Sequence, residues 1–131
     1  MIARGRTSRV FVYGSLRAGE PNHRLLLRAT LVGTARTEPC FALHDLGAFP
    51  AMVAGGMQAI VGEVYEVDDI TLAALDRLEG VPTFYQRVPI ALADGGTAET
   101  YTRLRAQVAR CPIVASGDWR AHRQETSRCR S

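Results

Sequence analysis

A well-marked helix near the middle of the chain is the feature that most limits the possible folds. Acidic Asp68 and Asp69 stand where the positive end of a helix dipole favours negative charge, Gly80 stands where helices commonly end, and Pro82 follows it. The apolar positions between them recur at helical spacing: Leu72, Leu75 and Leu78. The pattern predicts a helix over residues 69–79 with one buried side, which needs an apolar surface to pack on.

Short apolar and alternating runs on both sides of this helix predict strands that supply such a surface. The expected strands are residues 10–13, 31–37, 40–45, 59–67, 86–93 and 98–106. Asp94-Gly95 between the last two is a strong hairpin signal, so the sheet is at least partly antiparallel. A short helix is expected after Glu20-Pro21-Asn22, a loop over 46–56, and no regular pattern after Gln107. The fold class is therefore a mixture of α and β.

The length of 131 residues fits one domain. Basic residues are concentrated at the two ends of the chain, which favours solvated tails. We expect a basic N-terminal extension over 1–8, a domain over 9–122 and a polar tail over 123–131. Oligomeric state is left open.

Composition excludes several classes of function. No apolar stretch reaches the roughly 20 residues that cross a bilayer, and the N-terminus lacks the apolar region of a secretory signal, so we expect a cytoplasmic protein without membrane contact. The net charge of +3 comes without aromatic-basic interleaving, so no nucleic acid partner is expected. The cysteines, Cys40, Cys111 and Cys129, form no CxxC pair and lack a histidine at metal-ligand spacing. Neither a metal site nor a disulfide framework is expected.

Glu79 is an unusual carboxylate because of its place on the predicted helix. It follows Leu72 by seven residues and Leu75 by four, so it shares the leucine side, whereas Asp76 and Arg77 point outward. Burial and the negative end of the helix dipole would both raise its pKa. Such a group suits general acid and base catalysis. The alternative is an edge residue that reaches Arg87 or water.

The sequence Tyr13-Gly14-Ser15-Leu16 ends the first predicted strand and has two interpretations. Consecutive main-chain N–H groups there could form a nest that accepts an anion such as a carboxylate, and glycine would allow both a positive φ and close approach of a ligand. A plain turn that ends a strand explains the residues equally well. Ser15 is not expected to be a nucleophile because it lies outside a GxSxG motif and no histidine spacing marks a base for it.

Tyr85 completes the set of candidate site residues. It follows Glu79 by six residues, so its ring could fold back over the helix end and its hydroxyl could hold the carboxylate or a substrate. The alternative is an amphipathic ring at the rim of the core.

Together, these segments resemble the gamma-glutamylcyclotransferase-like family. The resemblance extends over nearly the whole chain and rests on VFVYGSLRAGEPNH (10–23), GEVY (62–65), LDRLEGVPTFYQR (75–87), the hairpin at DGG (94–96) and SGDWR (116–120). It implies a compact barrel-like mixed sheet with flanking helices. It also implies that the loop of Tyr13, Gly14, Ser15 and Leu16 binds the glutamyl group, that Glu79 is the general acid and base, and that no cofactor is needed.

The implied reaction cyclises a γ-glutamyl amine or amino acid to 5-oxoproline and releases the free amine. The substrate supplies its own nucleophile, the α-amine, so the enzyme needs to orient it and to move a proton. Tyr85 is counted with the loop among the expected substrate-binding residues. The strand expected over 98–106 is more polar than in the family, which leaves the leaving amine undetermined. The alternative function is a module of the same fold that binds a carboxylate metabolite without catalysis.

Overall fold

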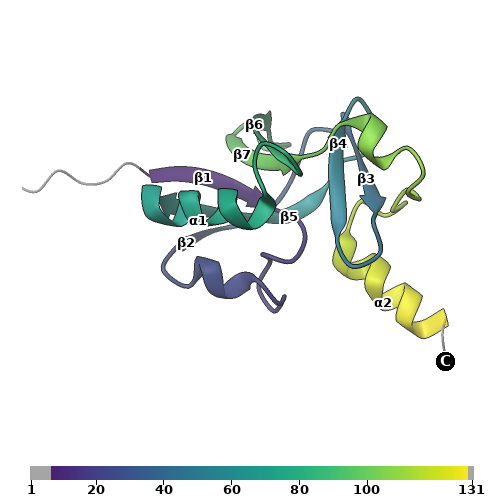
Figure 1. The fold of residues 1–131 in the computed structure, drawn as a ribbon, viewed down its shortest axis with the longest axis horizontal. Coiled ribbons are helices and arrows are strands. Elements are labelled where there is room, and N and C mark those ends of the chain that lie inside the picture. The colour runs from purple at the N-terminus through teal and green to yellow at the C-terminus, as the bar shows by residue number, and fades with distance from the viewer. Residues whose placement is uncertain (1–6, 130–131) are drawn as a thin grey trace, which may run out of the picture.

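The computed structural model describes residues 7–129, in which most strands precede the first α-helix and a hairpin and a second α-helix follow it (Figure 1). The strands are β1 (Thr7–Val12), β2 (Thr30–Arg36), β3 (Phe41–Asp45), β4 (Pro50–Ala54), β5 (Val61–Asp68), β6 (Gln86–Ala91) and β7 (Thr97–Thr102). The helices are α1 (Asp69–Glu79) and α2 (Trp119–Cys129), with 3₁₀ turns η1 (His23–Leu26) and η2 (Arg105–Val108). The expected mixture of α and β is confirmed. Residues 1–6 of the expected basic extension and residues 130–131 of the expected tail lie outside the described residues.

The strands form one mixed sheet in the order β2-β5-β1-β7-β4-β3, with β6 paired to β7 beside this path. The pairs β1–β5, β2–β5, β3–β4 and β6–β7 are antiparallel, whereas β1–β7 and β4–β7 are parallel. Within residues 7–129 the outermost strands β2 and β3 do not pair with each other, so the barrel-like sheet is open. The hairpin expected at Asp94-Gly95 is confirmed as the β6–β7 connection.

Helix α1 has the boundaries that the sequence predicts. The carboxylate of Asp68 accepts a 2.7 Å hydrogen bond from the N–H of Thr71, and Gly80 ends the helix in the left-handed conformation with φ of 65°. Leu75 is fully buried, and α1 lies alongside β1 and β5 (Figure 1). The end of α1 is therefore fixed beside the end of β1.

Strand β1 is buried on both faces, which gives its end a central position. Because side chains alternate along a strand, Val10 and Val12 join the core beneath α1, whereas Phe11 and the following Tyr13 join a second core. The second core includes Trp119 of α2, which lies on the side of β3 and β4 (Figure 1). The chain leaves β1 between the two cores.

Two expectations about irregular structure were wrong. Residues 50–54 lie in the segment expected as a loop but form β4, whose first four residues are buried. The segment after Gln107 was expected without a regular pattern but contains α2, which begins after Asp118; the expected start of the tail at residue 123 falls inside this helix. The Asp118 carboxylate accepts hydrogen bonds from the N–H groups of Arg120 and Ala121, at 3.0 and 3.3 Å, and so caps the helix. No helix of residues 7–129 is long and apolar enough to cross a membrane.

Candidate active site

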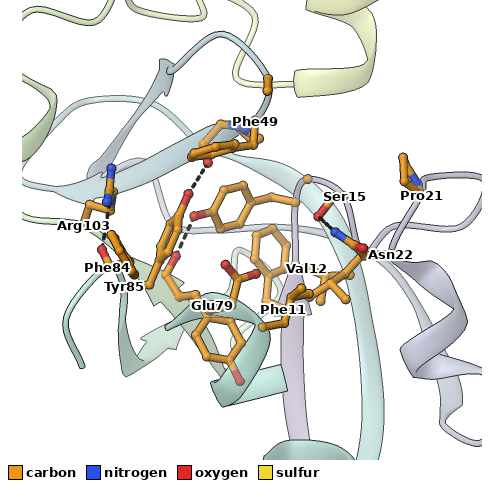
Figure 2. Close-up of a pocket in the computed structure, with 17 residues that line it drawn as sticks. Phe11, Val12, Ser15, Pro21, Asn22, Phe49, Glu79, Phe84, Tyr85 and Arg103 are labelled. Carbon is orange, nitrogen blue, oxygen red and sulfur yellow. Dashed lines mark hydrogen bonds between the residues drawn. The ribbon is translucent and has the colours of Figure 1, made fainter. Parts of the chain in front are cut away.

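A pocket of about 450 Å³ opens where the ends of β1 and α1 meet the starts of β4 and β6 (Figure 2). All six residues expected at the site from the sequence line it: Tyr13, Gly14, Ser15, Leu16, Glu79 and Tyr85. The other lining residues are mostly apolar or aromatic, among them Phe11, Phe49, Phe84 and Tyr101. The lining contains two charged residues, Glu79 and Arg103. The fold thus brings the separate sequence segments to one cavity.

Glu79 is the last residue of α1, and Figure 2 shows its carboxylate directed into the middle of the pocket. Burial raises the pKa of this carboxyl from its ordinary 4.5 to about 7. Among the described side chains and main-chain groups of residues 7–125 it has no hydrogen-bond or ion-pair partner. A carboxyl in this state can hold or release a proton near neutral pH.

The residue that could have neutralised Glu79 is engaged elsewhere. Arg87 lies 3.1 Å from the carboxylate of Asp76 and 2.9 Å from that of Glu99. Asp76 also accepts a 2.7 Å hydrogen bond from the hydroxyl of Tyr101. Asp76 was expected to point outward, but it contacts β6 and β7 because the hairpin packs beside the helix. The alternative in which Glu79 pairs with Arg87 is therefore not observed.

The loop after β1 begins with a tight turn, in which the N–H of Arg17 donates a 3.1 Å hydrogen bond to the carbonyl of Gly14. No hydrogen bond from the N–H groups of Gly14, Ser15 or Leu16 to another part of residues 7–129 is present. The three residues line the pocket, where an anion could accept from main-chain donors of this loop. Gly14 does not adopt the positive φ that glycine would allow. Glycine is required there by packing instead, because a Cβ atom would lie 2.8 Å from Cγ of Pro50.

A buried ion pair holds the far side of this loop. Nε of Arg17 lies 3.4 Å from the carboxylate of Glu63 on β5, and its Nη1 lies 3.1 Å from that of Asp118. The Glu63 carboxylate also accepts hydrogen bonds from the N–H of Ala18, at 2.9 Å, and the hydroxyl of Tyr65, at 3.0 Å. Charges that are buried and paired in this way fix the geometry of the chain around them. The loop is thereby tied to both β5 and the start of α2.

The hydroxyl of Ser15 is not activated as a nucleophile. It accepts a 2.9 Å hydrogen bond from the side-chain amide of Asn22. The nearest histidine in sequence, His23, has its Nδ1 3.0 Å from the carbonyl of Leu16. Among residues 7–125 no histidine forms a hydrogen bond to Ser15, so none is placed to serve as its base.

The hydroxyls of the two tyrosines expected at the site, Tyr13 and Tyr85, both donate their protons to main-chain carbonyls. Tyr13 donates a 2.6 Å hydrogen bond to the carbonyl of Tyr101 and accepts one of 3.1 Å from the N–H of Met52. Tyr85 donates a 2.8 Å hydrogen bond to the carbonyl of Pro50. Burial raises the pKa of both hydroxyls well above the ordinary value, so both stay protonated. Tyr85 can therefore offer a ligand the lone pairs of its oxygen and the face of its ring.

Arg103 was not among the residues expected from the sequence. It follows β7 directly, and its Nε donates a 2.8 Å hydrogen bond to the carbonyl of Phe84. Its guanidinium lies over the ring of Tyr85, 5.1 Å from the centroid. Arg103 lies inside the strand expected over 98–106, as does Arg105, so no sequence signal singled it out. The observed β7 ends at Thr102, and the parallel pairing of β7 with β1 places Arg103 at the pocket. Among the side chains that the structure describes, those of residues 7–125, no cluster of three or more His, Cys, Asp or Glu residues could hold a metal ion.

Comparison with known proteins gives the family. Residues 10–121 match the family described as "Gamma-glutamyl cyclotransferase, AIG2-like". The chain belongs to this family. A family relative from Vibrio cholerae, named "Putative gamma-glutamylcyclotransferase", is 47% identical over 110 residues, which make up 84% of this chain and 93% of the relative. Bovine gamma-glutamylaminecyclotransferase is 38% identical over 106 residues, 68% of this chain and 58% of that protein.

A solved structure supports the assignment of this chain to the gamma-glutamyl cyclotransferase family. The crystal structure of an AIG2-like protein from Mus musculus matches 82% of this chain and 85% of its own with a TM-score of 0.73, at 28% sequence identity. The resemblance expected from the sequence motifs is confirmed. The open mixed sheet is thus the fold of this family.

Proposed function

We propose that this chain cyclises the γ-glutamyl group of a γ-glutamyl amine or amino acid to 5-oxoproline, with Glu79 as the general acid and base. The observation that carries the proposal is the carboxyl of Glu79, whose pKa is about 7 and which lies in the pocket without a protein partner. Family membership supports the same type of activity.

Glu79 has the properties that the proton transfers need. The α-amine of a γ-glutamyl compound is mostly protonated near pH 7, so a base must take a proton before the amine attacks the γ-carbonyl carbon. A new carbon–nitrogen bond then closes the five-membered ring, and the bond to the leaving amine breaks as that amine gains a proton. Glu79 returns to the leaving amine the proton that it accepted. The ring nitrogen loses a second proton as the lactam forms, and the released amine takes up one proton more as an ammonium ion, so the reaction consumes no water and leaves Glu79 in its starting state.

The loop after β1 supplies an anchor for the other end of the glutamyl group. The N–H groups of Gly14, Ser15 and Leu16 have no partner within residues 7–129, and an α-carboxylate could accept from them. The buried pair of Arg17 and Glu63 fixes the loop before substrate arrives. Orientation matters because aligned intramolecular reactions reach effective molarities of about 10⁵–10⁸ M.

The aromatic walls serve the reaction by excluding water and by limiting where the chain of the substrate can lie. The hydroxyl of Tyr13 has both its proton and an acceptor site occupied by main-chain groups, so its ring acts as a wall. Tyr85 retains lone pairs that can accept from the α-amine. In this role Tyr85 orients the nucleophile and leaves the proton transfer to Glu79.

The test is release of 5-oxoproline from a panel that includes γ-glutamyl-alanine and γ-glutamyl-lysine. We expect turnover of at least one compound, with equal amounts of 5-oxoproline and free amine. Thermal unfolding in the presence of 5-oxoproline, measured in parallel, separates catalysis from binding. Stabilisation without turnover of any compound would favour a module that binds a carboxylate metabolite and would contradict the proposal.

A further inference from the structure

Arg103 is held in place at the pocket but is not neutralised. Its Nε donates to the carbonyl of Phe84, and its guanidinium plane is supported by the ring of Tyr85. Neither terminal nitrogen has a hydrogen-bond partner among the described groups of residues 7–125. The two contacts limit the motion of the guanidinium and leave its forked end available.

The other buried or half-buried arginines are all paired with carboxylates. Arg17 pairs with Glu63 and Asp118, Arg87 with Asp76 and Glu99, and Arg120 with Glu20. No carboxylate of residues 7–129 lies within the 4.0 Å of an ion pair from Arg103. A partly buried cation without a counter-charge attracts an anionic ligand, because low dielectric strengthens the interaction.

Arg103 and the loop after β1 occupy opposite ends of the pocket. In Figure 2, Arg103 and Phe84 lie at one side, Ser15 and Asn22 lie at the other, and Glu79 lies between them. A substrate that placed its glutamyl α-carboxylate at the loop and its γ-amide near Glu79 would extend its leaving group toward Arg103. The position of Arg103 therefore suits recognition of the leaving group.

We propose that Arg103 binds a carboxylate carried by the leaving amine. This makes γ-glutamyl amino acids better substrates than γ-glutamylamines that lack the carboxylate. The guanidinium fork matches a carboxylate in planar, bidentate geometry, which an ammonium group cannot reproduce. The inference rests on the proposed function, since it assumes which end of the substrate faces the loop.

Two substrates that differ by one carboxylate test the inference. γ-Glutamyl-alanine and γ-glutamyl-ethylamide share a skeleton, and the second lacks the carboxylate of the leaving group. The measured quantity is the ratio of their kcat/KM values for 5-oxoproline release. We expect this ratio to favour γ-glutamyl-alanine and to fall about 10- to 100-fold in Arg103→Met, with an intermediate loss in Arg103→Lys, which keeps the charge and loses the fork.

Arg105→Met is the matched control, because Arg105 is an exposed residue that does not line the pocket. Its ratio should equal that of the wild type. Equal losses of kcat/KM for both substrates in Arg103→Met would overturn the inference, because they would indicate that Arg103 binds the glutamyl group or stabilises the fold. If Arg103→Met does not fold, Arg103→Lys tests the inference instead. A ratio of kcat/KM values in Arg103→Lys equal to that of the wild type would also overturn the inference.

Failure of the proposed function gives a different result. In that case the wild type releases no 5-oxoproline from either compound, and calorimetric affinities for the same two compounds replace kcat/KM. A preference for γ-glutamyl-alanine that Arg103→Met abolishes would still support recognition by Arg103. Equal affinities, or binding of neither compound, would overturn it.

Discussion

The hydroxyl of Tyr85 donates a 2.8 Å hydrogen bond to the main-chain carbonyl of Pro50. This bond joins the segment after α1 to the first residue of β4, and Pro50 in turn packs against Gly14 at the end of β1. Three segments that are far apart in the sequence thus meet around Glu79. The relationship gives Tyr85 a structural role that is separate from any contact with substrate.

Tyr85→Phe should destabilise the fold slightly and reduce activity modestly. Loss of the bond to Pro50 should lower the free energy of unfolding by about 1 kcal/mol. We expect kcat/KM to fall less than 10-fold, because the proton of this hydroxyl is not available to the substrate. Denaturant unfolding and steady-state kinetics measure the two effects. A 1,000-fold loss of kcat with unchanged stability would show that the hydroxyl acts in the chemistry.

The buried pair of Arg17 and Glu63 should contribute to both stability and substrate binding. Glu63→Gln leaves Arg17 with Asp118 as its remaining partner, so we expect a loss of about 3 kcal/mol in unfolding free energy. The loop that carries the free N–H groups should also loosen, which would raise KM more than it lowers kcat.

An exposed pair provides the control for that variant. Arg9 and Glu66 lie 4.0 Å apart with side chains 50% and 44% exposed, so Glu66→Gln should cost less than about 1 kcal/mol and leave KM unchanged. Similar effects of the two substitutions on stability and KM would argue against a positioning role for the buried pair.

The sequence was most informative where local signals are strong. Asp68 and Gly80 mark the ends of α1, and the leucine spacing places Glu79 toward the core side, so both the helix and its unusual carboxylate could be predicted. The joint occurrence of the motifs also located the residues of one pocket, although they come from distant parts of the chain.

Other elements carried no local signal. Strand β4 begins with proline and is buried on both faces, so neither alternation nor turn residues distinguish it from a loop. Helix α2 has a predominantly polar sequence and depends on Asp118 and Trp119 at its start. Arg103 reaches the pocket through the parallel pairing of β7 with β1, a long-range relationship that periodicity does not encode.

The raised pKa of Glu79 predicts a pH-dependent stability difference between the wild type and Glu79→Gln. In the unfolded chain this carboxyl ionises near 4.5, whereas in the folded protein it ionises near 7. Between these values the folded state holds a proton that the unfolded state has lost, so wild-type stability falls as the pH rises and levels off above 7. Glutamine does not ionise, so Glu79→Gln lacks this loss of stability at high pH.

We therefore expect Glu79→Gln to match the wild type at pH 4 and to exceed it by about 1–3 kcal/mol at pH 8. Urea unfolding at the two pH values measures the difference. Glu38→Gln, which removes an exposed carboxylate outside the pocket, should show no such change. A difference that is the same at pH 4 and pH 8 would contradict the raised pKa.

The most direct measurement is kcat/KM for 5-oxoproline release by wild type, Glu79→Gln and Glu38→Gln on one γ-glutamyl substrate across pH 5–9. The wild type and Glu38→Gln should gain activity as the pH rises through about 7, because the base must be ionised to accept a proton. Glu79→Gln, folded as judged by circular dichroism, should lose about 10²–10⁴-fold at every pH. Full activity of Glu79→Gln, or a wild-type profile without a transition near pH 7, would contradict the assignment of Glu79 as the acid and base.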